Sequence, residues 1–306
     1  YAMPNFRPGL VHTPVTPFKR DQSIDFDAYG KLIEFHLRHG ADALALPMPP
    51  GEDISLTDGE LRTLLEFALK QVRGRVPVMA HVNDAGTDIA VARVRHAGQA
   101  GAAAIVSHPP YFWHPKASMV VEHIVRVGAA TRLPFFICSP PVEDVGTPLT
   151  TEIVLQALER LDNLAGVVDA SMDWVFMVEA LSLGRKTRPE FQLLPGTDYM
   201  VSAGVIGGSG AFSPLSGVAP KLVREVYDLC ARQQFTQARK AQEDLAALHH
   251  LVKTAGYAGL KGAMRAMGRD CGQPRPPARA LGEIEYGKLA QEIGAMDFLR
   301  AEPRGW

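Results

Sequence analysis

Side chains that could do chemistry stand at or just after the ends of short apolar runs. They carry imidazole, phenol, thiol, carboxyl and hydroxyl groups: His81, His108, Tyr111, Cys138, Ser139, Asp169, Ser171, Asp198 and Ser213. If these runs are parallel strands of one barrel, their carboxyl ends meet at a single mouth. An imidazole serves there as an acid, a base or a metal ligand near neutral pH, and a thiol serves as a nucleophile. The set predicts acid–base or nucleophilic chemistry at one end of a barrel.

Each candidate also has a structural interpretation. Tyr111 could pack at a subunit contact, Cys138 could be inert core, and the histidines could be hydrogen-bonded in the barrel wall. With Asp169 or Cys138, the two histidines could hold a metal, but no HxH or HExxH spacing supports a metal site. We therefore expect neither a metal nor a cofactor.

The apolar runs begin roughly 30 residues apart, as buried parallel strands separated by helices do. Amphipathic segments lie between them, and after Pro220 the pattern is wholly helical. We predict a (β/α)8 TIM barrel over residues 8–220 and a C-terminal helical extension over 221–306 that packs on the barrel. The predicted strands are 9–13, 43–47, 76–81, 103–107, 134–138, 164–168, 191–194 and 205–212.

Charge and cysteine content exclude several classes of protein. Lys and Arg total 32 and Asp and Glu total 33, with a net charge of -1. This balance disfavours nucleic acid and anionic membranes as partners and leaves a small molecule as the expected one. The three cysteines are far apart, and no apolar stretch reaches the roughly 18 residues of a membrane helix. We expect a cytoplasmic protein.

A series of motifs in matching order carries a family resemblance: Val15-Thr16-Pro17-Phe18, Pro50-Gly51-Glu52, Arg75-Val76-Pro77-Val78, Pro110-Tyr111, Gly166 to Ser171, Gly196-Thr197-Asp198, Leu260-Lys261-Gly262-Ala263 and Arg275-Pro276-Pro277. The chain resembles, over nearly its whole length, the family of dihydrodipicolinate synthase and N-acetylneuraminate lyase, the pyruvate-using class I aldolases. The resemblance implies the barrel fold and a homotetramer built as a dimer of dimers.

The resemblance also implies that the characteristic chemistry of the family is altered. The family lysine that forms a Schiff base with pyruvate falls on Val168, and an isopropyl group cannot condense with a carbonyl. Only a displaced lysine such as Lys116 or Lys261 could replace it. The carboxylate-binding motif of the family reads Met48-Pro49-Pro50-Gly51-Glu52, in which two prolines remove hydroxyls and backbone donors.

Other family positions depart as well. One relay tyrosine falls on Cys138, and the second, which a neighbouring subunit usually lends, falls on Phe112. The arginine that binds the second substrate's carboxylate falls near Glu143 and Asp144, which argues against an anionic co-substrate. Phe212 would narrow the pyruvate pocket.

These departures predict a lyase-like enzyme that acts on a small carbonyl substrate without Schiff-base catalysis. One alternative is a non-catalytic homologue that binds a small molecule or has a structural role, and another is a hydrolase that uses Cys138 and His108. The predicted catalytic residues are Tyr111, Cys138, His108 and Asp169. The predicted substrate-binding residues are Pro50, Gly51, Glu52, His81, Ser139, Val168, Ser171, Asp198, Phe212 and Ser213.

Overall fold

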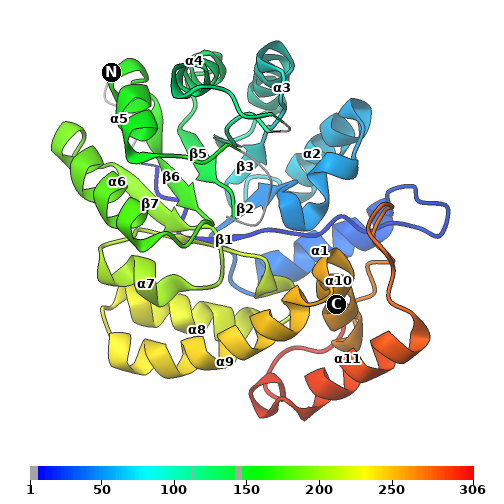
Figure 1. Ribbon diagram of the computed structural model, residues 1–306. Coiled ribbons are helices and arrows are strands. Elements are labelled where there is room, and N and C mark those ends of the chain that lie inside the picture. Colours follow the sequence, from blue (N-terminus) through cyan, green and yellow to red (C-terminus); the bar gives the residue numbers. More distant parts are fainter. Residues whose placement is uncertain (1–5, 112, 142–146) are drawn as a thin grey trace.

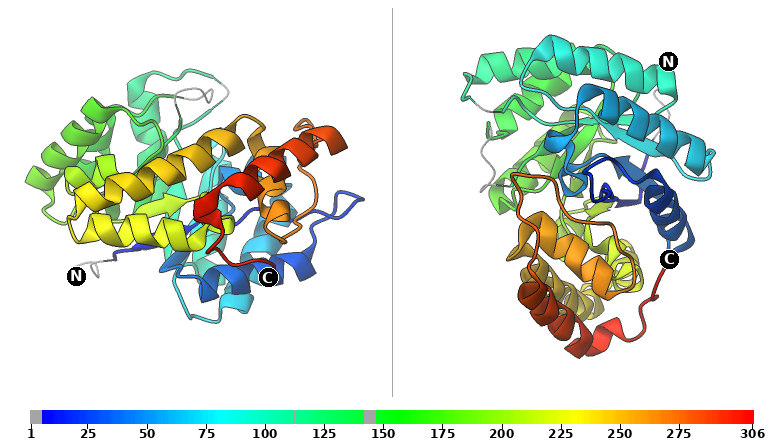
Figure 2. Two further views of the ribbon diagram at one scale, coloured as in Figure 1. Left: turned by 90° about the horizontal axis from the view of Figure 1, so that it is seen from below. Right: turned by 90° about the vertical axis from the view of Figure 1, so that its right-hand side faces the viewer.

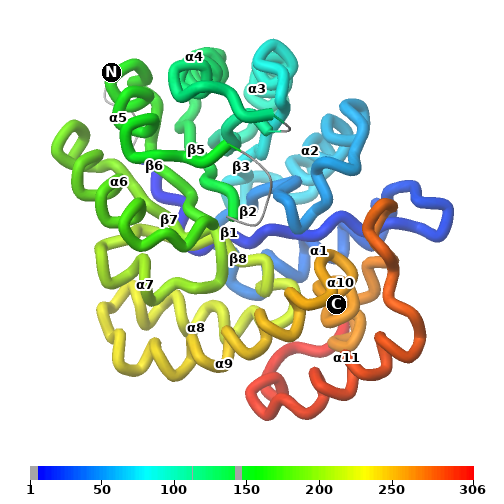
Figure 3. Tube along the Cα trace, viewed as in Figure 1, coloured from blue at the N-terminus to red at the C-terminus, as the bar shows by residue number. Residues whose placement is uncertain are grey.

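The structure, a computed structural model, describes residues 6–111, 113–141 and 147–306. Eight parallel strands form one sheet in the order β7-β6-β5-β4-β3-β2-β1-β8. Ser209 N donates to Leu193 O at 3.1 Å, which brings the start of β8 against β7 and nearly closes the barrel. Figure 3 shows β8 beside β1, its partner in the ladder. The predicted TIM barrel is confirmed. The strands are β1 (Leu10–His12), β2 (Ala43–Leu46), β3 (Val78–His81), β4 (Ala104–Ser107), β5 (Phe135–Ser139), β6 (Leu164–Asp169), β7 (Gln192–Pro195) and β8 (Ala211–Ser213).

Strand alternation divides the apolar side chains into two layers. Inward-facing residues such as Val11, Met79 and Phe136 fill the barrel interior. Their neighbours in sequence, such as Leu10 and Ile137, face outward into a larger core under the helices. Successive strand side chains point to opposite faces, so each run serves both cores at once. For this reason the strand segments show no regular alternation of apolar and polar residues.

Helices cover the outside of the barrel, as Figure 1 shows. The Asp25 side chain accepts from Ala28 N at the start of the first helix, and Thr57 and Glu60 form a capping box at the start of the second. Such caps satisfy the free N–H groups of a first helical turn. The barrel helices are α1 (Phe26–Arg38), α2 (Asp58–Val72), α3 (Thr87–Ala100), α4 (Ala117–Gly128), α5 (Thr151–Arg160), α6 (Trp174–Thr187), α7 (Met200–Val205) and α8 (Pro220–Ala231).

The last predicted strand is partly wrong. Val205 ends helix α7, and β8 begins only at Ala211. The segment between them turns back through Gly207, whose φ of 91° is open to glycine and strained for other residues. Apart from Ser209, the run consists of apolar residues and glycines, so hydrophobicity alone does not separate a turn of this kind from a strand.

A helical extension follows the barrel, as predicted. It consists of α9 (Phe235–Lys253), α10 (Gly256–Ala266) and α11 (Glu283–Ala295). In Figure 2 these yellow-to-red helices lie across the front of the molecule in the left view and at its bottom in the right view. Within the described residues, no helix has the length and hydropathy that crossing a membrane requires.

Candidate active site

Two buried histidines meet inside the barrel. His81 ends β3 and His108 follows β4, each two residues beyond an inward-facing residue, Met79 and Val106. His81 Nε2 lies 2.8 Å from His108 Nδ1, and the rings stand edge to face at 89°. The structure therefore brings together two residues that the sequence placed on neighbouring strand ends.

The hydrogen bonds assign the protons of this pair. Burial lowers the pKa of both imidazoles, so both rings are neutral at pH 7. His81 Nδ1 lies 2.8 Å from Pro47 O, and a carbonyl only accepts, so Nδ1 of His81 carries the proton. His81 Nε2 then accepts from His108 Nδ1. In this tautomer His108 Nε2 keeps its lone pair, as a general base requires.

A carboxylate that the sequence reasoning missed lies beside the pair. Asp53 begins a short 3-10 helix after β2, η2 (Asp53–Ser55), and its Oδ2 is 3.6 Å from His81 Nδ1. Burial raises the pKa of Asp53, and the charge of Asp53 raises the pKa of His81 against the larger effect of burial. Asp53 and His81 also line a cavity of about 190 Å³, together with Asn83, Asp84, Arg93 and Tyr111.

A cluster of apolar side chains lies around Val168, the residue that the family resemblance aligns with the Schiff-base lysine. Val168 pairs with Cys138 across the β5–β6 ladder, and both pack with Met48 and Phe212 in the barrel interior. Val168 is 0% exposed and Cys138 2%. Burial, followed by the charge of Asp169, raises the pKa of the Cys138 thiol. A thiol in this environment stays protonated at neutral pH and is a poor nucleophile.

The remaining polar candidates form separate groups. Asp169 accepts from Ser171 Oγ at 2.6 Å and from the backbone of Ser171 and Met172, which caps the turn after β6. Asp198 accepts from Ser213 Oγ and from Leu215 N. Ser139 is buried at the end of β5. None of these contacts includes His81 or His108.

The loop after β2 binds the extension. Pro50 and Gly51 lie in a 3-10 turn, η1 (Pro49–Gly51), and Thr16 Oγ1 donates to Gly51 O at 2.6 Å. Glu52 is 0% exposed and forms an ion pair with Lys261 Nζ at 2.6 Å. The Lys261 amine is thus committed to a carboxylate, while Lys116 caps α4 on the surface. Neither lysine stands among the residues around Val168.

Tyr111 is half-buried, and burial raises its pKa. Its neighbour Phe112 and the residues Glu143 and Asp144 lie outside the described residues. Where the structure describes the chain, no group of three or more His, Cys, Asp or Glu side chains is arranged to hold a metal ion.

One further polar group at the barrel mouth was not predicted. The Thr13 hydroxyl is buried and has no hydrogen-bond partner within the described residues. Thr13 lies two residues beyond inward-facing Val11, so it is placed on the same face as the histidines. Asp53 and Thr13 both sit next to motifs that the sequence shows, Pro50-Gly51-Glu52 and Val15-Thr16-Pro17. Their proximity to strand ends was the available signal.

Comparison with known proteins agrees with this architecture. Residues 7–296 match the model of the dihydrodipicolinate synthetase family. An "Uncharacterized DapA-like lyase" of Halobacterium salinarum is 31% identical over 293 residues, which is 95% of this chain and 94% of the relative. A 4-hydroxy-tetrahydrodipicolinate synthase of an Azoarcus species is 31% identical over 285 residues, with 92% and 95% covered.

A solved structure shows the same fold. The dihydrodipicolinate synthase of Aquifex aeolicus superposes with a TM-score of 0.88 at 24% identity, over 94% of this chain and 97% of that one. The family match covers most of the chain and agrees with the observed barrel. The chain belongs to the dihydrodipicolinate synthetase family.

Proposed function

We propose that the protein is a lyase-like enzyme that acts on a small carbonyl compound by general acid–base catalysis, with no Schiff base. The observation that carries this proposal is the 2.8 Å hydrogen bond between His81 and His108, whose tautomers leave a basic Nε2 on His108. The relative named as a DapA-like lyase supports the reaction class.

His108 Nε2 is the group that would move the proton. It takes a proton from the carbon next to the substrate carbonyl, whose electron pair forms the enolate. With a β-hydroxy carbonyl compound it takes the hydroxyl proton instead: the O–H electron pair forms the new carbonyl, and the Cα–Cβ bond breaks to leave the enolate. The imidazolium that results is stabilised through His81 by the Asp53 carboxylate, and it returns the proton to the product. The Thr13 hydroxyl, for which the described part of the chain offers no hydrogen-bond partner, supplies a hydrogen bond for the developing oxyanion.

The surroundings of Val168 support the absence of an amine nucleophile. This position is packed with Cys138, Met48 and Phe212, and the buried amine of Lys261 is held by Glu52. A lysine amine forms a Schiff base only where it is unprotonated and touches the carbonyl. Borohydride trapping with pyruvate, followed by intact-mass measurement, checks this part of the proposal, because a trapped adduct would contradict it.

The experiment for the reaction is a turnover screen of small uncharged aldehydes, ketones and hydroxy ketones. We expect His108→Ala to lower kcat/KM at least about 100-fold, the lower range for losing a general base. Cys138→Ala is the matched control and should retain activity. The proposal fails if no compound turns over, or if turnover survives His108→Ala.

A non-catalytic, ligand-binding homologue is the second candidate. The apolar packing of Val168, Phe212 and Met48 favours it, since such filling needs no chemistry. A ligand that binds only the folded state raises the melting temperature. Stabilisation by a carbonyl compound without any turnover would favour this candidate. A hydrolase that uses Cys138 has less support, because burial keeps its thiol protonated.

We also propose a cytoplasmic homotetramer built as a dimer of dimers. Trp113 is half exposed beside Tyr111 in the loop after β4, and exposed aromatic side chains commonly mark an interface. Light scattering at micromolar concentration should give the mass of four chains. A monomer would contradict the proposal.

A further inference from the structure

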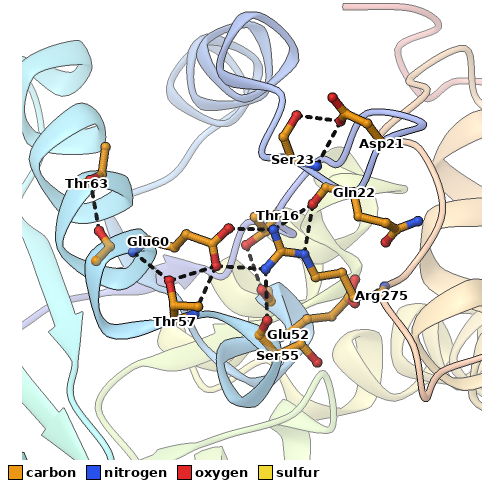
Figure 4. Close-up of polar contacts among 12 residues, drawn as sticks. Thr16, Asp21, Gln22, Ser23, Glu52, Ser55, Thr57, Glu60, Thr63 and Arg275 are labelled. Carbon is orange, nitrogen blue, oxygen red and sulfur yellow. Dashed lines mark hydrogen bonds and ion pairs between the residues drawn. The ribbon is translucent and has the colours of Figure 1, made fainter.

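One arginine of the extension binds two loops of the barrel. Arg275 follows α10 and donates to Glu60 through two nitrogens, with Nη1–Oε2 of 2.8 Å and Nη2–Oε1 of 2.6 Å. The same guanidinium donates to Ser55 O at 2.9 Å and to Gln22 O at 2.6 Å. Figure 4 shows Arg275 pointing between Glu60, Gln22 and Ser55. A bidentate fork of this kind fixes its partners more tightly than a single hydrogen bond.

The backbone of the same residue also reaches the loop after β2. Arg275 N donates to Glu52 Oε2 at 2.8 Å, while Lys261 binds the other carboxylate oxygen. Both oxygens of Glu52 are therefore held by the extension. Glu52 adopts a left-handed backbone conformation with a φ of 58°. A residue without glycine's freedom stays there only when its surroundings enforce it.

These contacts hold the segment that carries Asp53 at both ends. Glu52 directly precedes Asp53, and Ser55 is the last residue of η2. Asp53 itself pairs with His81, and among the described residues no hydrogen bond or ion pair joins it to the extension. Its position 3.6 Å from His81 is thus set by the conformation of a turn that Arg275 and Lys261 fix.

We propose that Arg275 is a positioning residue: through Glu52, Ser55 and Glu60 it holds η2 so that the Asp53 carboxylate faces His81. This inference rests on the proposed function, because it concerns the acid–base pair named there. Its test measures the pKa of the His81 imidazole and does not require a substrate or catalytic activity. A failed turnover screen and a failed positioning test are therefore distinguishable.

Several other groups face His81 from elements whose residues are not among the hydrogen-bond partners of Arg275. Arg93 of α3 donates to Asn83 O and pairs with Asp58 and Asp84, and His108 is the ring partner of His81. Tyr111 lines the same cavity. The loop that Arg275 holds carries Asp53, and Pro47 O, the acceptor of His81 Nδ1, lies just before it. An Asp53→Asn background separates the effect of the carboxylate from that of the carbonyl. A change in the pKa of His81 on mutation of Arg275 that disappears in this background therefore reports the position of Asp53.

The experiment is an NMR titration of ring-labelled histidine, with His81→Gln used to assign the signal. Arg275→Met keeps an unbranched side chain but removes the guanidinium, and with it the bidentate pair with Glu60 and the contact of Cζ with the Phe18 ring at 4.4 Å. We expect it to lower the pKa of His81 by about one unit, the smaller end of the effect of an opposite charge at this distance. Arg275→Lys keeps the charge without the bidentate geometry and should give a smaller fall. Arg279→Met removes another bidentate arginine pair of the extension, with Glu285, and is the matched control.

Coupling to Asp53 separates positioning from a general structural role. In an Asp53→Asn background, Arg275→Met should cause no further fall in the pKa of His81, because the charge it repositions is already gone. The inference is overturned if Arg275→Met leaves the His81 titration unchanged. It is also overturned if the fall is equally large in the Asp53→Asn background or in Arg279→Met. If Arg275→Met does not fold, Arg275→Lys and Glu60→Gln are judged by the same criteria.

Discussion

Replacing Lys261 by methionine should destabilise the protein strongly, because it leaves a charge buried without its partner. The Glu52 carboxylate is 0% exposed and the Lys261 side chain 2%, with 2.6 Å between charged atoms. Removing one partner of a buried ion pair lowers the free energy of unfolding by about 3–5 kcal/mol. At about 2.1 cal/mol/K per residue, 306 residues unfold with an entropy near 0.6 kcal/mol/K, so the melting temperature should fall by about 6 °C.

The double variant Glu52→Gln/Lys261→Met distinguishes this cause from lost packing. It removes both charges, so urea unfolding should recover to within about 2 kcal/mol of wild type, since neutral replacement of a buried pair is often tolerated. Lys288→Met makes the same exchange on an exposed lysine of α11 and should change stability by less than about 0.5 kcal/mol. The reasoning is refuted if Lys261→Met melts like wild type, or if the double variant is less stable than Lys261→Met.

Three further predictions concern other parts of the chain. Val168→Lys should not restore aldolase turnover with pyruvate and aldehydes, because the family resemblance implies that Cys138 and Pro49-Pro50 replace the relay and carboxylate-binding groups; ordinary family rates would contradict this. Burial lowers the pKa of His36 from 6.5 to about 3, so the unfolded chain binds more protons below pH 6.5 and stability is lost as the pH falls toward 3. The urea midpoint of His36→Leu should therefore decline less steeply between pH 6.5 and pH 4 than that of wild type, and a parallel decline would exclude His36 as a cause. Asn163 Nδ2 donates to Gly128 O, Thr131 O and Leu133 O, so Asn163→Ala should lower the free energy of unfolding by about 1–3 kcal/mol in urea, and an unchanged midpoint would contradict this.

The sequence predicts the barrel well because a parallel barrel buries both faces of each strand. The resulting apolar runs and the caps at Asp25 and Thr57 are local signals. The turn between α7 and β8 could not be predicted from hydrophobicity, because Val205 and Ile206 before the turn are as apolar as Ala211 and Phe212 in the strand.

The candidate site was predictable only in part. His81 and His108 are marked by their places at strand ends, and the structure joins them directly. The role of Asp53 depends on a left-handed Glu52 and on Lys261 and Arg275, which follow it by more than 200 residues in the chain. No local sequence pattern predicts a contact between residues so far apart in the chain. Asp169 and Asp198 stand at predicted strand ends as well, yet their carboxylates are occupied by local hydrogen bonds.

Proton exchange at the carbon next to a carbonyl is a direct measure of whether His108 acts as a base. Dihydroxyacetone in D2O, followed by proton NMR, reports abstraction of that proton even when no bond is cleaved. The account predicts exchange with the wild-type protein and with Cys138→Ala, and a loss of at least about 100-fold in His108→Ala. Equal exchange rates in wild type and His108→Ala, or no exchange above the protein-free rate, would contradict the assignment of His108 as the base.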